Sequence, residues 1–238
     1  MRIRTLFNFC LLLVVSIVSL PAQKVPGQKP DPSPAAVMAR GAWEFGPFAN
    51  GGFGTGDRSS FSFFDVGVHA GNVLTNPVGP FILRGQFEFA AELMPLWQAY
   101  TPAPHLQNVS YVADGVTHFA QIGVSGGTFT GVSLTPVILR WNLQSTHKMV
   151  PYIQGAGGLI WTNHKFPPDF LVPEGVPGRT SVFNFTPQFG VGFHYFVKPK
   201  RSIAFTANAV HISSASLGDR NPGVNASVQL QLGYTWWK

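Results

Sequence analysis

The chain has 238 residues, of which only 11% are charged and 13% are aromatic, and it contains 26 glycines. Charged residues are too few for an ordinary soluble protein, and beyond the first 22 residues no stretch is long and apolar enough for a transmembrane helix. The formal net charge of +6 comes from scattered Lys and Arg without a basic stripe, which argues against a nucleic acid as partner.

Residues 1–22 have the pattern of a secretory signal peptide. The positive region Met1–Arg4 precedes an apolar stretch, Leu11–Leu20, and a small residue follows at Ala22, after which we predict cleavage. Cleavage there would remove Cys10, which is the only cysteine. The exported protein would then contain no disulfide, no thiol nucleophile and no cysteine-ligated metal.

Residues 23–40 are rich in proline and are predicted to form a flexible leader before one domain over 41–238. Apolar and polar residues alternate through this domain, which predicts eight antiparallel strands. The predicted strands are Ala42–Gly54, Ser60–Leu74, Phe81–Leu96, Thr128–Asn142, Val150–Asn163, Ser181–Val197, Ser202–Ser214 and Asn225–Trp237. Several are long enough to cross a bilayer at a tilt, which favours an all-β, up-and-down transmembrane barrel.

The third predicted strand, Phe81–Leu96, shows the alternation most clearly, with apolar residues on one face and polar residues on the other. In a small barrel the polar face fills the lumen, where Arg84 is expected to pair with Glu88 and Glu92. In a soluble sandwich the same face would meet solvent, so the alternation alone does not separate the two folds.

The lengths of the connections between the predicted strands distinguish the barrel from the sandwich. The second, fourth and sixth connections are short, whereas the third and fifth, Trp97–Gly127 and His164–Thr180, are long. Short turns on one side and long loops on the other are typical of barrels in the bacterial outer membrane. With the N-terminus in the periplasm, the seventh strand runs outward.

His211 and Ser213 lie near the outer end of that seventh strand and point to one face. Apolar residues at Ile203, Phe205 and Ala209 share this face, so we expect it to contact lipid. A hydroxyl beside a base is the arrangement of a nucleophilic esterase. The pair would then lie at the level of the outer leaflet, where lipopolysaccharide resides.

Four segments in the last hundred residues carry a resemblance to a known family. They read TPVILRWN at 135–142, FNFTPQFGVG at 183–192, HISSA at 211–215 and GDRNPGVN at 218–225. Together they resemble the outer-membrane lipid A 3-O-deacylases, the PagL-like enzymes often labelled acyloxyacyl hydrolases. The resemblance implies an eight-stranded barrel with a serine-hydrolase site on its lipid-facing surface. It would release the 3-linked acyl chain of lipid A without a metal or cofactor.

By position in these motifs, the resemblance implies that Ser213 is the nucleophile and His211 the general base. Asn221 and the backbone N–H near Ala215 fall at the positions that stabilise the oxyanion. The chain departs from the family at Ser214, where asparagine is usual.

A second departure concerns the acidic residue that orients the histidine in the family, because Asn225 stands at its position. An amide fixes the imidazole tautomer but does not stabilise imidazolium by charge. The alternation of the last strand also places Asn225 on the lumen side, which leaves Asp219 in the adjoining loop as a substitute acid. The set of His211, Ser213 and Asn225 is also similar to the His-Ser-Asn set of outer-membrane phospholipase A, a larger barrel that uses calcium.

Four cations are expected on the extracellular side, either in contact with lipid A phosphates or as solvated charges. They are Arg58, Lys165, Arg179 and Arg220. We therefore expect lipid A and the outer-membrane bilayer as partners, and a monomer or a weak homodimer. A phospholipase acting on glycerophospholipids and a catalytically silent barrel with a structural or adhesive role remain the alternatives.

Overall fold

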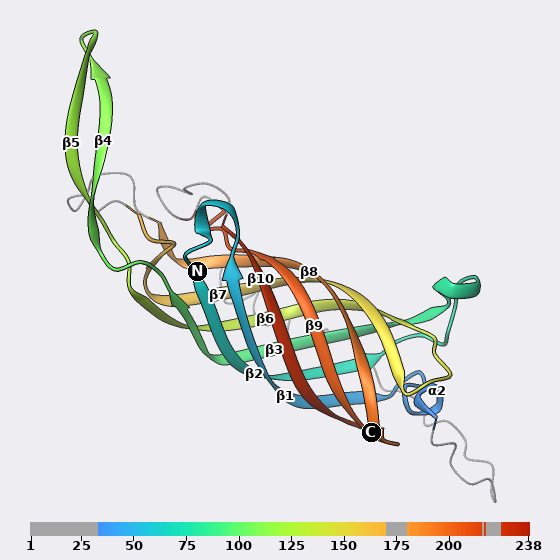
Figure 1. Cartoon of the computed structure of the whole chain (residues 1–238). Coiled ribbons are helices and arrows are strands. Elements are labelled where there is room, and N and C mark those ends of the chain that lie inside the picture. Colours follow the sequence, from blue (N-terminus) through green and yellow to red (C-terminus); the bar gives the residue numbers. More distant parts are fainter. Residues whose placement is uncertain (1–32, 170–179, 216, 218–224) are drawn as a thin grey trace, which may run out of the picture. The chain divides into compact units, whose positions relative to one another are not determined.

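Eight antiparallel strands close into a barrel in the computed structural model (Figure 1). Their order around the barrel is β1-β10-β9-β8-β7-β6-β3-β2, so successive strands of the barrel are neighbours. The strands are β1 Trp43–Gly54, β2 Ser62–Val73, β3 Gly85–Tyr100, β6 Thr128–Leu143, β7 Met149–Phe166, β8 Ser181–Lys198, β9 Arg201–His211 and β10 Ala226–Trp237. This arrangement confirms the predicted up-and-down barrel.

The structure describes residues 33–169, 180–215, 217 and 225–238. The chain divides into two units, Met1–Asp31 and Pro32–Lys238, and all described residues belong to the second. The predicted signal peptide and most of the predicted leader therefore lie outside the described residues. None of the helices formed by the described residues is long and apolar enough to cross a membrane.

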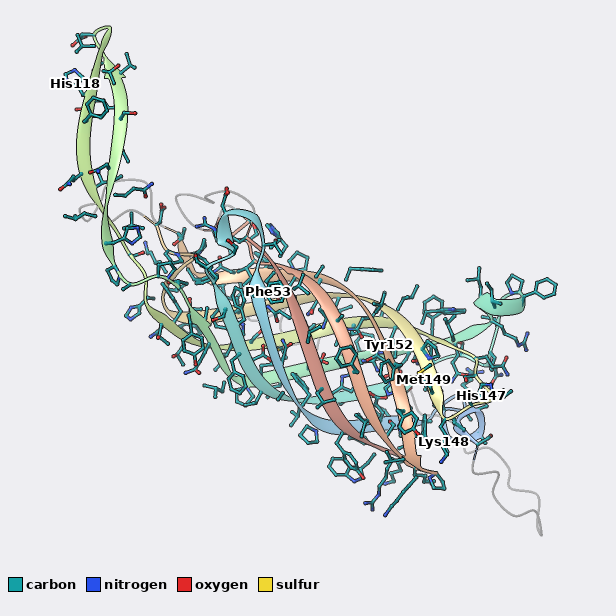
Figure 2. All side chains as sticks on the ribbon, in the orientation of Figure 1. Phe53, His118, His147, Lys148, Met149 and Tyr152 are labelled. Carbon is teal, nitrogen blue, oxygen red and sulfur yellow. The ribbon has the colours of Figure 1, made fainter. Side chains whose placement is uncertain are left out.

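The third connection contains a hairpin where the sequence predicts only a long connection. Strands β4, His105–Ala113, and β5, Val116–Val124, pair only with each other in a separate two-stranded sheet. Asp114 and Gly115 join them with positive φ angles of 51° and 76°, the backbone that a tight two-residue hairpin turn requires. In Figure 2 His118 lies on this hairpin, whereas His147, in the short turn between β6 and β7, lies at the other end of the barrel.

The second connection is longer than predicted, because β3 begins at Gly85 and not at Phe81. Phe81–Leu83 form a short 3-10 helix, η2, and all three side chains are exposed. Arg84 follows this helix, is exposed, and donates through Nε to Oε1 of Gln144 over 2.8 Å. The predicted lumen pairing of Arg84 with Glu88 and Glu92 is therefore wrong.

Arg140 is the arginine that fills the middle of the lumen. Its Nη1 lies 3.2 Å from Oε1 of Glu44 and 3.3 Å from Oε1 of Glu88. His69 lies beside them, with Nε2 2.7 Å from Oε1 of Glu44 and Nδ1 3.1 Å from Oε1 of Glu92. All five side chains are buried. The lumen is thus filled by side chains rather than open as a pore.

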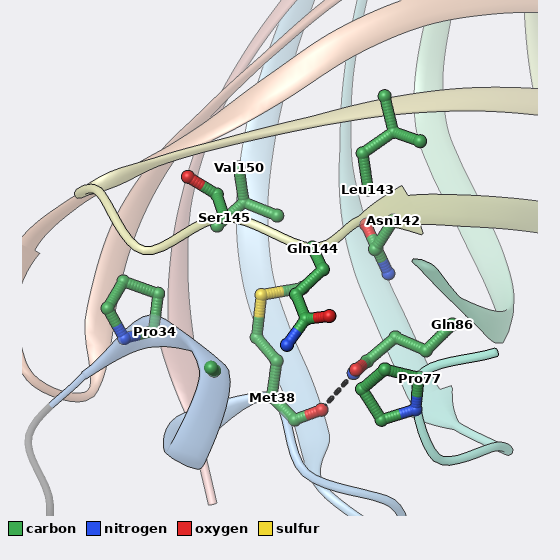
Figure 3. Close-up of a pocket in the computed structure, with 10 residues that line it drawn as sticks. Pro34, Met38, Pro77, Gln86, Asn142, Leu143, Gln144, Ser145 and Val150 are labelled. Carbon is green, nitrogen blue, oxygen red and sulfur yellow. Dashed lines mark hydrogen bonds between the residues drawn. The ribbon is translucent and has the colours of Figure 1, made fainter. Parts of the chain in front are cut away.

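Apolar clusters fill the lumen on both sides of the buried charged residues around Arg140. One cluster gathers Phe61, Phe63, Trp97, Ala99, Phe129, Ile160, Phe166, Val210 and Ile212, at the end with the long connections. The other contains Met38, Val73, Val150, Phe196 and Trp237, near the short turns. The helical turn α2, Pro34–Val37, leads into it, and Figure 3 shows the Met38 carbonyl oxygen accepting a hydrogen bond from the Gln86 amide.

Candidate active site

The end of β9 presents the predicted His211–Ser213 pair on the outward face. Burial alternates along β9, with inward Thr206 and Asn208 buried and outward Ala209 exposed. His211 pairs with Ala226 of β10 at the last rung. The alternation thus places His211 on the lipid-facing side, as predicted.

Beyond β9 the chain continues for two residues against β8 before it turns. Ser213 forms an isolated bridge with Phe185, with N–H to O distances of 3.0 and 2.7 Å in the two directions. Between His211 and Ser213, the Ile212 side chain is 1% exposed and packs into the apolar cluster at this end of the lumen. Because Ile212 is anchored inward, His211 and Ser213 are held on the outward face.

A tight turn follows Ser213 and directs a backbone N–H back at its hydroxyl. The N–H of Ala215 donates to Oγ of Ser213 over 3.2 Å. Ala215 has a φ of 45°, a left-handed conformation that costs an L-residue about 1–2 kcal/mol. Strain of this kind is often stored at functional sites. An N–H at this place can stabilise negative charge on an oxygen beside Ser213, the role implied for Ala215 by its position.

Asn225 lies on the inward side of the same strand pair, as its alternation predicts, and is 5% exposed. Its Oδ1 accepts a hydrogen bond of 2.9 Å from Nε of Arg58, and its main-chain oxygen accepts one of 2.9 Å from the N–H of Ile212. The structure therefore joins Asn225 to the His211–Ser213 segment through the backbone and to Arg58 through the side chain. Its predicted role of orienting His211 stays a prediction.

Arg58 ends the short 3-10 helix η1, Gly56–Arg58, which connects β1 to β2. It is half-buried, and its guanidinium carbon lies 5.3 Å from the centre of the Phe61 ring. Burial lowers the pKa of Arg58, and the carboxylates of Asp57 and Asp169 oppose that shift. The side chain remains a cation at neutral pH. Its inward contact was not visible in the sequence, because Arg58 and Asn225 are 167 positions apart.

The other predicted site residues divide into two groups. Lys165 is exposed near the end of β7, on the side of the long connections. Asp219, Asn221, Arg179 and Arg220 lie outside the described residues, so their predicted roles stay predictions.

Within the described part of the chain, Glu44, Glu88 and His194 place one potential metal ligand each within 4.8 Å of one another. Nη1 of Arg140 occupies that space, at 3.2 Å from Glu44 Oε1, 3.3 Å from Glu88 Oε1 and 3.2 Å from His194 Nε2. A permanently charged guanidinium repels a metal cation. This cluster is therefore an ion-pair network and is unsuited to a metal.

Small outward residues follow His211 along β9. They are Ala209 and Ala207, the next two outward residues, which we call the alanine stretch. Ala209 pairs with Phe189 of β8 and Val228 of β10, and Ala207 is flanked in the same way by larger apolar side chains. The alanine stretch therefore lies next to His211, between larger apolar side chains of the outward face.

Comparisons with known proteins give a family match and similar solved structures. The family model "Lipid A 3-O-deacylase (PagL)" matches residues 85–235, which include the His211–Ser213 pair. No curated protein matches the chain. Similar solved structures include Neisserial surface protein A (NspA), with 14% identity over 83% of this chain and 99% of that one and a TM-score of 0.48. Another is OprG of Pseudomonas aeruginosa, with 10% identity, 84% and 98% coverage and a TM-score of 0.40.

The match covers more than half of the chain, and it agrees with a barrel whose outward face is apolar. The protein resides in the bacterial outer membrane. The chain belongs to the PagL family of lipid A 3-O-deacylases.

Proposed function

We propose that this protein is an outer-membrane serine esterase that removes the 3-O-linked acyl chain from lipid A. The observation that carries the proposal is the position of His211 and Ser213, which share the lipid-facing side of the barrel at the end with the long connections. A lipid ester in the outer leaflet reaches this position without entering the barrel. The family match supports lipid A as the substrate class.

In the proposed reaction, Oγ of Ser213 attacks the ester carbonyl carbon while Nε2 or Nδ1 of His211 accepts its proton. The carbonyl oxygen becomes an oxyanion, for which the Ala215 N–H is a donor. The bond between the acyl carbon and the ester oxygen then breaks, the oxygen stays on the sugar as an alkoxide, and the protonated His211 returns its proton to it. Water activated by His211 hydrolyses the acyl-enzyme and restores Ser213.

The remaining parts of lipid A fit the surroundings of the pair. We assign the 3-O-acyl chain to the alanine stretch, because its small apolar side chains follow His211 on the same face of β9. Lys165 offers an exposed cation on the same side of the barrel for a lipid A phosphate. We assign the same role to Arg179 and Arg220, and oxyanion stabilisation to Asn221.

The direct test replaces Ser213 by alanine and measures lipid A from cells by mass spectrometry. We expect Ser213→Ala to fold into the outer membrane as a heat-modifiable barrel while deacylation is lost. His211→Asn should match it, and the double variant should lose no more, because nucleophile and base act as a unit. Ser214→Ala is the matched control, since its buried Oγ has no hydrogen-bond partner among the described residues. Full activity in Ser213→Ala would overturn the proposal.

A phospholipase is the second candidate, because the sequence positions of His211, Ser213 and Asn225 are similar to the His-Ser-Asn set of outer-membrane phospholipase A. Purified protein assayed on lipid A and on a glycerophospholipid, with and without a calcium chelator, separates the two. Activity on lipid A that persists with chelator supports the deacylase. Calcium-dependent release of fatty acid from the phospholipid alone supports the phospholipase.

A further inference from the structure

The first connection of the barrel is hydrogen-bonded to the beginning of the last strand. The N–H of Thr55 donates to the carbonyl oxygen of Ala226 over 2.9 Å, and Oγ1 of Thr55 donates to the same oxygen over 3.2 Å. One residue earlier, Oδ1 of Asn225 accepts the hydrogen bond from Nε of Arg58 over 2.9 Å. Three hydrogen bonds thus attach residues 55–58 to Asn225, just before β10, and to Ala226, its first residue.

Those two residues are also the support of the segment that carries the catalytic pair. Ala226 is the ladder partner of His211, and the main-chain oxygen of Asn225 accepts the N–H of Ile212. Asn225 is therefore held from both sides, by Arg58 through its side chain and by Ile212 through its backbone. Strand ends fray more readily than strand centres, and this support acts where the β9–β10 ladder ends.

We propose that Arg58 is a positioning residue for the deacylation, which fixes His211 and Ser213 through Asn225 without touching the substrate. This inference rests on the proposed function. A displacement of about 1 Å between nucleophile, base and ester lowers the reaction rate roughly a hundredfold. Loss of the Arg58 hydrogen bond to Asn225 is therefore expected to lower the rate of deacylation. The role differs from a phosphate contact, which would act on substrate binding.

The surroundings of Arg58 favour the positioning role. Its Nε points to an amide oxygen on a residue that is 5% exposed, and its guanidinium lies over the Phe61 ring. Phe61 belongs to the same apolar cluster as Ile212, so the arginine side chain lies against the core that anchors the catalytic segment. Lys165, in contrast, is exposed.

The test compares variants of Arg58 that keep different properties of the side chain. Glutamine places an N–H donor at the position of Nε without the charge, whereas lysine keeps the charge on a longer stem. We expect Arg58→Ala to lower kcat about tenfold with KM within about twofold of wild type. Arg58→Gln should recover most of kcat, and Arg58→Lys should recover less. Arg84→Ala, an exposed arginine at the other end of the barrel, is the control and should be unchanged.

The assay uses purified full-length protein in detergent with lipid A, and it includes Ser213→Ala. The losses of kcat in Arg58→Ala and Asn225→Ala should not add in the double variant, since both substitutions break the same hydrogen bond. Hydrogen exchange at the Ile212 amide should accelerate in Arg58→Ala while exchange in the centre of β9 stays slow. A raised KM rescued by lysine, or wild-type kcat in Arg58→Ala, would overturn the positioning role. Activity in Ser213→Ala would instead overturn the proposed function.

Discussion

At the scale of single residues, the site depends on side chains that point alternately outward and inward along the strand. His211 and Ser213 face outward because Ile212 between them is buried in the apolar cluster. Their side chains start about 6.6 Å apart along the strand, a separation that a serine and a histidine can bridge. The same alternation, read on β10, turns Asn225 inward to Arg58.

Position 225 yields the first prediction. Asn225→Ala should lower deacylation less than Ser213→Ala or His211→Ala, because it removes a supporting group and not a reacting one. Asn225→Glu should maintain or raise activity, since a carboxylate makes a charge-assisted hydrogen bond with Arg58 or orients His211. Mass spectrometry of lipid A measures both variants. A neutral Asn225→Ala together with a severe Asp219→Ala would assign the orienting role to Asp219.

At the scale of elements, β9 combines a polar inner face with an outer face of small residues below the site. Ala209 and Ala207 lie between strands that present large exposed side chains such as Phe189 and Leu230. Sequence alternation predicted which residues face lipid. The neighbours of the alanine stretch required the register, because they come from β8 and β10.

The alanine stretch yields the second prediction. Ala209→Phe should lower activity on lipid A roughly tenfold while the barrel still folds, because the added ring lies on the outward face and fills the path of the acyl chain. Ile203→Phe, farther along the same face of β9, is the matched control and should have little effect. Rates on purified lipid A measure both. Equal rates in Ala209→Phe and wild type would show that the acyl chain takes another path.

The sequence predicted the elements unequally, for identifiable reasons. The eight barrel strands follow from alternation, since each has one face toward lipid and one toward the lumen. The β4–β5 hairpin was missed although Asp114-Gly115 is a tight-turn dipeptide, because its strands are mostly exposed and have no buried face to set an alternation. The β3 boundary was placed too early, because the apolar residues of Phe81–Leu83 continue the period of the strand without belonging to it.

The candidate site was predictable only in part. Local spacing placed His211 and Ser213 together, since two residues on one strand need no tertiary information. The contact between Arg58 and Asn225 joins residues that lie near opposite ends of the barrel sequence, and no local sequence pattern predicts it. The same holds for Arg140, which takes the lumen position predicted for Arg84.

At the scale of the whole molecule, the connections assign the two ends of the barrel, which yields the third prediction. A tag inserted between Asp114 and Gly115, at the tip of the β4–β5 hairpin, should be accessible to antibody on intact cells. A tag near Lys200, in the short turn between β8 and β9, should be accessible only after the outer membrane is permeabilised. Insertion near Pro173 should behave like the hairpin tag. The reverse pattern would place His211 and Ser213 at the periplasmic end.

The lumen network yields the fourth prediction. Arg140→Ala should destabilise the barrel by about 3–5 kcal/mol, because it removes the guanidinium from two buried carboxylates, Glu44 and Glu88. The measurement is the temperature at which the folded band on SDS gels converts to the unfolded band. Arg84→Ala, which removes an exposed arginine, should leave that temperature unchanged. An unchanged temperature in Arg140→Ala would show that water replaces the guanidinium.

Because the lumen is filled from the aromatic cluster at one end to Trp237 at the other, no part of a lipid passes through it. Both products of the proposed reaction, a free fatty acid and a lipid A with one chain fewer, therefore stay in the leaflet that supplied the substrate. The enzyme meets its substrate by lateral diffusion in two dimensions. Its rate is then set by the mole fraction of lipid A around the barrel and not by a concentration in bulk solution, and diluting the substrate with inert detergent slows the enzyme even when the amount of lipid A is unchanged.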